Sequence, residues 1–397
     1  MSTPAAGLRA GSMEAPGLEP VAATPGGQQT DAAPRRAATP YLRLDVASAV
    51  ERFRRLAAAL PGTDIHYAVK ANPEPALLAA LHGAGSKFDV ASPAEVDATL
   101  SVGASAADLV HSNPVTRRSD LMLAAAQGVR LFVVDSLEET AKVASVAPGA
   151  AVLCRLVTSG AGSDWPLSCK FGCSTEQAVE VLRYAASVGL DAAGVSFHVG
   201  SQQRDPGAWA APIAASARVF ELLGAEGCRP RLLDLGGGFP ANLDSDCLAP
   251  EIYGRAIEEL LEKHFATRRP TTMVEPGRGI AADAGVLSTE VLAVVHRNGA
   301  RWVFLDVGVF TGLIETIGEA IRYPIETDLD GGPTGPCVIA GPTCDSADVL
   351  YQRTKVDLPL ELAEGDVVRL RGTGAYTSCY STVGFNGFPP LPTHVVP

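Results

Sequence analysis

Residues that could do chemistry follow short apolar runs at seven points along this chain. The clearest is Lys70 in the stretch HYAVKANP (residues 66–73), where an apolar run ends in an amine. A buried lysine is costly unless it is paired or chemically used. The other six points are Asp89, Asp135, Arg155, His198, Gly236–Gly238 and Glu275. One such residue indicates little, but their repetition at the ends of successive runs predicts a common site.

Two of these stretches suggest a phosphate site. The triplet in LDLGGGFP (233–240) exposes backbone N–H groups to close approach, and Arg278 in EPGRG (275–279) adds a bidentate anion donor. A glycine triplet alone is more often a tight turn. Neither stretch matches GxGxxG or a Walker loop, so a dinucleotide or a nucleoside triphosphate is not indicated.

A phosphate site, a lysine, a carboxylate and a histidine are together the parts that hold pyridoxal phosphate. Lys70 would form the Schiff base, and we expect burial to lower its pKa enough to supply a neutral amine. A carboxylate against the pyridine nitrogen would keep that ring protonated, so that the ring acts as an electron sink. A flat imidazole would stack on the ring face.

The elements that must position these residues alternate between residue 46 and about residue 275. Hydrophobic periodicity predicts helices over 46–60, 74–83, 93–102, 117–127, 136–147, 175–188, 206–226 and 250–266. Apolar, β-rich runs predict strands over 65–69, 87–91, 108–111, 130–134, 151–157, 194–199, 231–235 and 272–275. Eight helix-then-strand units predict an α/β fold, a (β/α)8 TIM barrel, with an open doubly wound sheet as the alternative. Such barrels carry their chemistry at the carboxyl ends of the strands, where the seven points lie.

The chain divides into three parts by composition. Residues 1–38 are rich in Ala, Pro and Gly, and we expect a disordered tail. Residues 39–280 hold the predicted barrel. Residues 281–397 are β-rich and predict a second, mostly antiparallel β domain, which the early strand 41–45 is expected to join.

Composition limits the classes of function. The 397 residues carry a formal net charge of -12, which argues against nucleic acid and mildly suits a cationic substrate. No run approaches the roughly 18 apolar residues of a membrane span, and no secretory signal opens the chain, so a cytoplasmic protein is expected. The 8 cysteines are scattered, which fits reduced thiols. Cys169 and Cys173 are close in sequence, but no second pair completes a metal site.

Seven motifs give the chain a family resemblance. They are YAVKAN, FDVAS, SFHVGSQ, LDLGGGFP, EPGR, GPTCDSAD and GAYTSCYSTVGFNGFPP, in this order from about residue 40 to the C-terminus. The series resembles the fold-type III pyridoxal-phosphate decarboxylases, which act on ornithine, diaminopimelate or arginine and have an alanine-racemase-like fold. Among these, DWPLSCKFG, LIETIGEAIRYPI and AGPTCDSAD are most similar to the short bacterial ornithine or lysine/ornithine decarboxylases.

The resemblance implies roles for individual residues. Lys70 would bind pyridoxal 5'-phosphate covalently, His198 would stack on its ring, and Glu275 would face the pyridine nitrogen. The supporting and phosphate-binding residues would be Asp89, Arg155, Ser201, Gly237, Gly238, Gly277, Arg278 and Tyr376. It also implies a homodimer in which Cys344, the acid that protonates Cα, and Asp345 reach into the other subunit's site.

The resemblance implies decarboxylation of a basic L-amino acid, foremost ornithine to putrescine in polyamine biosynthesis. Asp345 and Glu319 would bind the terminal ammonium of the substrate. Gly318 stands where an acidic residue is expected, which leaves more room and one charge fewer. Lysine or another, modified amino acid therefore stays open as the substrate, and an inactive regulatory homologue is the alternative from a different class. A racemase on a similar barrel would use a second base, commonly tyrosine, instead of this cysteine.

Overall fold

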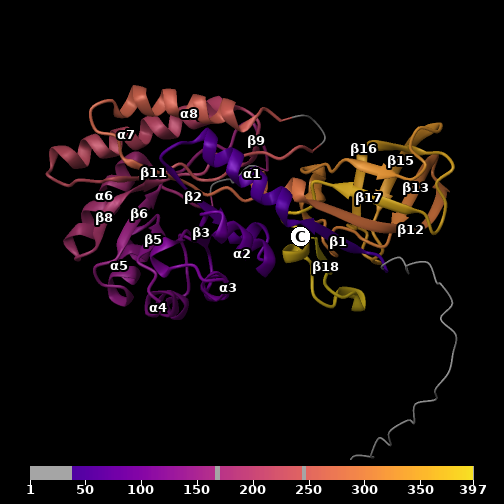
Figure 1. Cartoon of the computed structure of the whole chain (residues 1–397), viewed down its shortest axis with the longest axis horizontal. Helices are drawn as coiled ribbons and strands as arrows, with labels where there is room; N and C mark the ends of the chain where they lie inside the picture. The colour runs from indigo at the N-terminus through magenta and orange to yellow at the C-terminus, as the bar shows by residue number, and fades with distance from the viewer. Residues whose placement is uncertain (1–37, 166–169, 244–246, 397) are drawn as a thin grey trace, which may run out of the picture. The chain divides into compact units, whose positions relative to one another are not determined.

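Eight parallel strands of the chain close into a barrel. The computed structural model describes residues 38–165, 170–243 and 247–396, and the strand order around the barrel is β10-β11-β2-β3-β4-β5-β6-β8 (Figure 1). The strands are β2 (Thr63–Ala68), β3 (Lys87–Val90), β4 (Leu109–His111), β5 (Leu131–Val134), β6 (Ala151–Arg155), β8 (Asp191–Ser196), β10 (Leu232–Asp234) and β11 (Thr271–Val274). The predicted TIM barrel is confirmed, and the open doubly wound sheet is wrong.

Each barrel strand is preceded by a helix, as the periodicity predicted. The helices are α1 (Val46–Ala59), α2 (Pro75–Gly83), α3 (Pro93–Ser101), α4 (Arg118–Ala126), α5 (Leu137–Val146), α6 (Thr175–Ser187), α7 (Ala210–Ala225) and α8 (Pro250–Phe265). Local sequence sets several of their starts, because the hydroxyl groups of Ser92, Ser136 and Ser174 accept N–H groups of the first turn of α3, α5 and α6. Short 3-10 turns cover 69–71, 106–108, 206–209, 282–284, 314–319, 378–380 and 385–387, and α9 (Arg278–Ala281) follows β11.

The barrel has two apolar layers that follow from strand alternation. In β5, Phe132 and Val134 pack in the large cluster beneath the helices, whereas Val133 belongs to a separate inner cluster with Leu153 and Met273. Successive side chains of a strand point to opposite faces, so one strand serves both layers. The lumen is therefore packed, and the space for chemistry lies at the ends of the strands.

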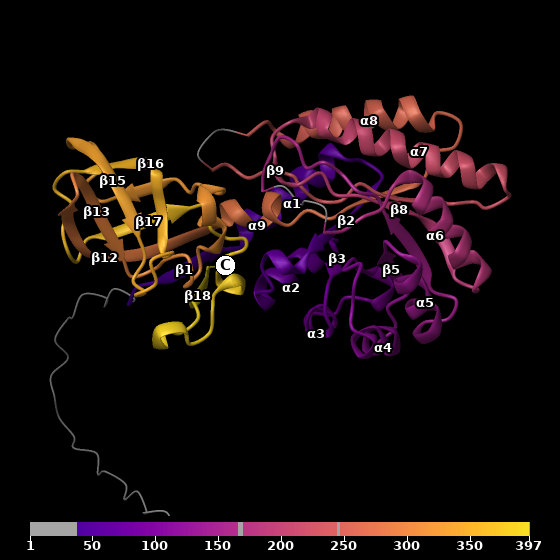
Figure 2. The same ribbon diagram turned by 180° about the vertical axis from the view of Figure 1, so that it is seen from behind.

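The later part of the chain forms a second sheet. Its order is β14-β17-β12-β13-β15-β16, and β1 pairs antiparallel with β12 and parallel with β18 (Figure 2). The strands are β1 (Tyr41–Asp45), β12 (Gly285–Arg297), β13 (Ala300–Leu305), β14 (Ile325–Thr327), β15 (Thr334–Ala340), β16 (Val349–Pro359), β17 (Val367–Arg371) and β18 (Thr393–Val396). Most pairs are antiparallel, which confirms the predicted fold class. The domain boundaries of the sequence analysis stay a prediction, and the expected tail lies outside the described residues except for Ala38.

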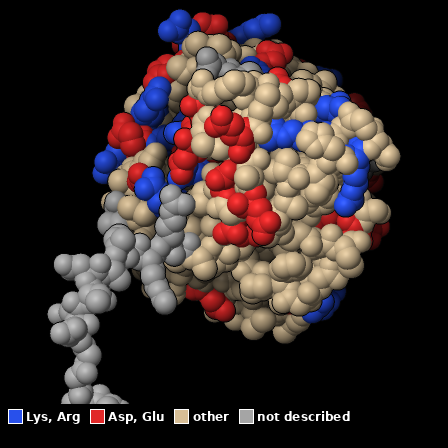
Figure 3. Space-filling view, turned by 90° about the vertical axis from the view of Figure 1, so that its right-hand side faces the viewer, with Lys and Arg blue, Asp and Glu red and all other residues tan. Residues whose placement is uncertain are grey.

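Within residues 38–165, 170–243 and 247–396, no helix is long and apolar enough to cross a membrane. The same residues contain no group of three His, Cys, Asp or Glu side chains that could hold a metal ion, and Cys169 lies outside them. On the face in Figure 3, acidic side chains gather in a central band, with basic side chains to either side.

Candidate active site

A cavity of about 430 Å³ opens where the barrel strands end. Residues that follow or end β2, β3, β4, β6, β8 and β11 line it, together with residues from the connections of the second sheet. They are Lys70, Ala91, Ser112, Asn113, Pro114, Arg155, Leu156, Thr158, Trp165, Lys170, Phe171, His198, Ser201, Glu275, Glu315, Tyr376 and Tyr380. Six of the predicted site residues are thus brought together by the structure.

Lys70 lies just beyond the end of β2, in a 3-10 turn. Its Nζ donates a 2.5 Å hydrogen bond to Oδ2 of Asp89, which is 1% exposed in β3, and Ser112 Oγ donates to the other carboxylate oxygen. Burial lowers the pKa of the Lys70 amine, but the charges of Asp89 and Glu275 raise it by more, so the pKa lies above its ordinary value. The expectation that burial lowers this pKa enough to give a neutral amine is therefore wrong, because the two neighbouring carboxyl groups favour the charged form.

Glu275 follows β11 and faces the cavity with one oxygen unsatisfied. Its Oε1 is buried with no hydrogen-bond partner among the described residues, and the same holds for Oδ2 of Asp234, which ends β10. Burial, and then the closeness of the two carboxyl groups, raises the pKa of Glu275 well above its usual range. Burial is also the main cause that raises the pKa of Asp234 to about 7. The protonated pyridine nitrogen of pyridoxal phosphate would supply the hydrogen-bond donor that Glu275 Oε1 lacks.

The ring of His198 is held neutral beside Lys70 and Arg155. The N–H of Gly200 donates to His198 Nδ1 over 3.0 Å, so the ring proton belongs on Nε2. Burial, followed by the charges of Arg155 and Lys70, lowers the pKa of His198 well below its usual range. A Cβ at Gly237 would lie 3.0 Å from His198 Nε2 and 2.6 Å from the Glu275 carbonyl oxygen, so only glycine fits there. The imidazole is thus a flat, uncharged surface in a fixed orientation.

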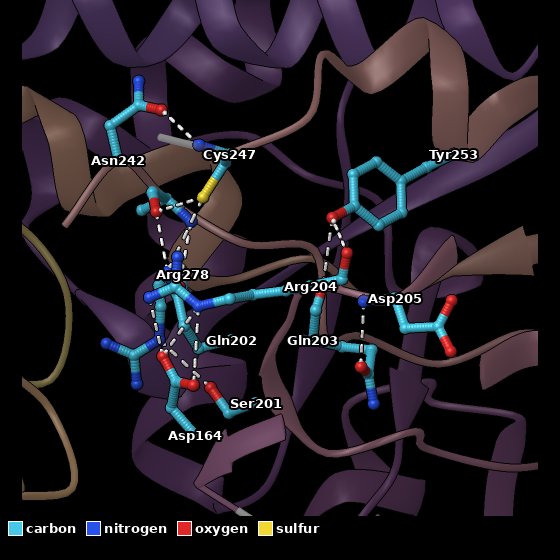
Figure 4. A network of polar contacts seen from close by, with 11 residues as sticks. Asp164, Ser201, Gln202, Gln203, Arg204, Asp205, Asn242, Cys247, Tyr253 and Arg278 are labelled. Carbon is cyan, nitrogen blue, oxygen red and sulfur yellow. Dashed lines mark hydrogen bonds and ion pairs between the residues drawn. The ribbon is translucent and has the colours of Figure 1, made fainter. Parts of the chain in front are cut away.

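Arg278 is a buried cation with one nitrogen free. Its Nε donates to Ser201 Oγ over 3.1 Å (Figure 4). Its Nη2 donates to Glu315 Oε1 over 2.6 Å. Its guanidinium lies 5.0 Å from the centre of the Tyr376 ring, and Nη1 is buried without a partner among the described residues. A Cβ at Gly277 would come within 3.0 Å of Tyr376 Oη. This arrangement can accept an anion such as a phosphate between Arg278, Ser201 and Tyr376.

Two acidic residues of this region escaped the sequence analysis. Asp234 stands directly before the glycine triplet, and its Oδ1 accepts the N–H of Gly236 over 2.9 Å. Glu315 is the acid within the apolar stretch LIETIG and is 4% exposed. Asp234 could have been predicted as an acid at a strand end, and Glu315 as an acid among apolar residues.

The seven strand-end points do not all meet in the cavity. Asp135 follows β5, but its Oδ2 accepts the N–H of Gly172 over 2.9 Å, and it does not line the cavity. Asp135 supports the segment that carries Phe171, whose ring lies 5.5 Å from the Arg155 guanidinium. The expectation of a common site is therefore wrong for Asp135, because a backbone amide occupies its carboxylate.

The predicted substrate acid Glu319 lies away from this chain's cavity. Its carboxylate accepts the backbone N–H groups of residues 352–354 on β16, at 2.6 to 3.1 Å. These bonds lower the pKa of Glu319 although burial opposes them. The carboxylate thus fastens the turn around Gly318, whose φ is 66°, to β16.

Cys344 and Asp345 are exposed and do not line this chain's cavity either. The N–H of Cys344 donates to Asn386 Oδ1 over 3.1 Å, and Asp345 Oδ1 accepts the N–H of Ala347 over 2.8 Å. The Cys344 thiol is free. The structure of one chain therefore does not bring these two residues to Lys70.

Comparisons with known proteins agree with the geometry. The family model described as "Pyridoxal-dependent decarboxylase, pyridoxal binding domain" matches residues 46–282. The lysine/ornithine decarboxylase of Selenomonas ruminantium is 34% identical over 361 residues, which are 90% of this chain and 90% of the relative. Antizyme inhibitor 2 of Xenopus laevis is 31% identical and covers 88% of this chain and 78% of its own length. The crystal structure of lysine/ornithine decarboxylase from Vibrio vulnificus complexed with cadaverine has a TM-score of 0.82 and 34% identity, covering 90% of this chain and 94% of that chain.

Proposed function

Because the chain belongs to the pyridoxal-dependent decarboxylases, we propose that its substrate is L-ornithine and its product is putrescine, a precursor in polyamine biosynthesis. The chain is an amino-acid decarboxylase that uses pyridoxal 5'-phosphate. This is the family that its motifs resemble. The relatives named above support a basic amino acid as the substrate.

One observation carries the proposal: three groups that could bind one small molecule lie in or beside one cavity. The Lys70 amine and the unpartnered oxygen of Glu275 line it. The third group is the unpartnered nitrogen of Arg278, whose guanidinium contacts the lining residues Ser201 and Tyr376. Pyridoxal phosphate offers an aldehyde, a pyridine nitrogen and a phosphate, which are the three complementary groups. The residues of the cavity therefore fit this cofactor.

When bound, pyridoxal 5'-phosphate would supply an electron sink for the pair that remains at Cα after the carboxylate leaves as CO2. Glu275 would hold a proton on the pyridine nitrogen, and the neutral ring of His198 would cover one ring face. Arg278 and Ser201 would bind the phosphate, with Tyr376 beside them. Lys70 would give up its bond to the cofactor when the substrate amine binds. It would form that bond again after the product leaves.

We propose that a second copy of the chain completes the site. Cys344 and Asp345 are exposed and lie outside their own chain's cavity, so they could serve only a neighbouring one. In a homodimer, the Cys344 thiol would return a proton to Cα, and Asp345 would pair with the terminal ammonium of the substrate. Glu319 is engaged on β16, so we assign it no substrate contact in this proposal.

The test is a screen of ornithine, lysine, arginine and diaminopimelate with mass detection of the amine product. We expect putrescine from ornithine, with the highest kcat/KM of the four, and no amine from the Lys70→Ala variant. Faster formation of cadaverine from lysine would overturn the ornithine assignment but leave the reaction class intact. No amine from any of the four would contradict a decarboxylase of basic amino acids.

Two alternatives have specific support. Lysine is favoured by the names of two relatives, which are lysine/ornithine decarboxylases. A regulatory homologue is favoured by the likeness to antizyme inhibitor 2. The regulatory homologue predicts that the purified chain lacks the visible absorbance band of the lysine-bound cofactor, whereas both decarboxylases predict that band.

A further inference from the structure

Two consecutive glutamines lie behind the proposed phosphate site, fully buried. Gln202 and Gln203 are both 0% exposed and end the short strand β9 (Ser201–Gln203), which pairs with β7 (Ser163–Trp165). Gln202 has a φ of 57°, which a side-chain-bearing residue adopts only under strain. A buried amide in a strained backbone needs compensating contacts.

Gln202 finds these contacts on the loop that follows the glycine triplet. Its Nε2 donates to the carbonyl oxygen of Ala241 over 2.7 Å, and its Oε1 accepts the N–H of Ala241 over 2.9 Å. Cys247 Sγ also donates to the Ala241 carbonyl oxygen over 2.7 Å. Figure 4 shows this network next to Ser201 and Arg278. One side chain thus satisfies both backbone groups of Ala241, as a paired strand would.

Gln203 makes further hydrogen bonds between the loop of Ser201 and the loop of the glycine triplet. Its backbone N–H donates to the carbonyl oxygen of Gly238 over 2.9 Å, and its side-chain Nε2 donates to the carbonyl oxygens of Val199 and Ala161, each over 3.0 Å. The loops are in close contact, because a Cβ at Gly238 would lie 2.6 Å from the Gly200 carbonyl oxygen.

Ser201 directly precedes this clamp and is the hydroxyl that Arg278 contacts. We propose that Gln202 is a positioning residue for the cofactor phosphate: its amide fixes the loop of Ser201 at a set distance from the loop of Gly237 and Gly238. Gln202 touches no part of the cavity itself. It acts by keeping the hydroxyl and the glycine N–H groups in place before the anion arrives, which reduces the ordering that binding requires.

The experiment uses Gln202→Gly, which removes the amide but suits the positive φ. Dissociation constants of the cofactor-free protein are measured for pyridoxal 5'-phosphate and for pyridoxal, which lacks the phosphate, from the visible absorbance of the bound form. We expect the affinity for pyridoxal 5'-phosphate to fall about tenfold or more, as expected for losing two hydrogen bonds. The affinity for pyridoxal should stay within about twofold, so that the preference for the phosphate shrinks.

Asn298→Gly is the matched control, because Asn298 has a φ of 51° in the turn between β12 and β13, outside the cavity. It should change neither constant. Gln202→Glu keeps the acceptor for the Ala241 N–H but loses the donor, so an intermediate loss of phosphate preference is expected. If Gln202→Gly weakens both ligands equally, or neither, the proposal is overturned, and Gln202→Glu gives the same decision should the glycine variant fail to fold.

The inference rests on the phosphate site proposed above, and Arg278→Gln separates the two. If Arg278→Gln loses the preference for the phosphate while Gln202→Gly keeps it, the phosphate site stands and the role of Gln202 is wrong. If Arg278→Gln keeps the preference, the phosphate lies elsewhere and both assignments fail.

Discussion

At the scale of single residues, the site is defined by the groups that it leaves unsatisfied. Buried polar atoms in folded proteins nearly always have partners. Glu275 Oε1 and Arg278 Nη1 have none among the described residues, and they line or adjoin the cavity that contains Lys70. Both atoms therefore indicate a bound molecule with a cationic donor at one end and an anion at the other.

Asp89→Asn tests the electrostatic control of Lys70. Asp89 raises the pKa of the amine, so its neutralisation leaves burial dominant and lowers that pKa. Because the neutral amine attacks the cofactor aldehyde, the rate of attachment should reach its half-maximum at a lower pH, by about one unit or more. Stopped-flow absorbance measures the rate from pH 8 up to the highest pH at which the chain stays folded, and the displacement of the midpoint is read from the rising part of this pH dependence.

Asp64→Asn is the control, because Asp64 pairs with Lys87 over 2.8 Å outside the cavity. It should leave the midpoint in place. A midpoint that stays put or rises in Asp89→Asn would show that Asp89 does not set the charge of Lys70.

The sequence predicted residues that line the cavity better than the residues that support them. Lys70, His198 and Glu275 all line the cavity, and each was predicted because it follows an apolar strand within a motif. Gln202 was not, since its role depends on the approach of Ala241, which is far away in sequence. Spacing along the chain cannot reveal such a contact.

At the scale of elements, the glycine loop after β10 is the tightest part of the site. Gly238 has a φ of 105°, and a Cβ there would meet the Gly200 carbonyl oxygen at 2.6 Å and Val199 Cγ2 at 2.7 Å. Both the backbone conformation and the space exclude any other residue. The loop therefore holds its shape only as glycine.

Gly238→Ala should lower the free energy of unfolding by about 1–3 kcal/mol through strain, with a further loss from the clash. It should also weaken cofactor binding, because the loop must shift away from Gly200. Gly85→Ala is the control, with a φ of 97° and nothing within 4 Å of the added Cβ. It should lower the free energy of unfolding by about 1 kcal/mol and leave cofactor binding unchanged. If Gly238→Ala and Gly85→Ala give the same free energy of unfolding in urea and the same cofactor affinity in titration, the special role of Gly238 is refuted.

Elements were predicted in the right places, with errors at their ends. All eight barrel strands were found, but Lys70 belongs to a 3-10 turn beyond β2 and His198 to a loop beyond β8. A strand ends where its ladder of hydrogen bonds ends, and that depends on its neighbours. The small β7–β9 pair was missed because three-residue strands leave almost no pattern.

At the scale of the whole molecule, the proposal requires two copies of the chain. Mixing Lys70→Ala with Cys344→Ala chains should raise the rate of normal product formation above that of either variant alone, because each mixed dimer has one site with both residues. The Cys344→Ala variant alone should bind the cofactor normally but protonate Cα slowly or give another product. The two variants are denatured, mixed and refolded together. Their activity is then compared with that of the same chains refolded separately.

No gain on mixing would contradict a shared site. Unchanged turnover and product in Cys344→Ala would remove this thiol from the mechanism. Neither result would affect the assignment of Lys70.

The most direct test of the account is to identify the residue that binds the cofactor. Borohydride reduction makes the bond between the cofactor and an amine permanent, and peptide mass mapping then locates it. Lys70 and Lys170 are the two lysines that line the described cavity. The account predicts the modification on Lys70 and its loss in Lys70→Ala. Modification of Lys170 instead, or of neither lysine in protein saturated with the cofactor, would contradict it.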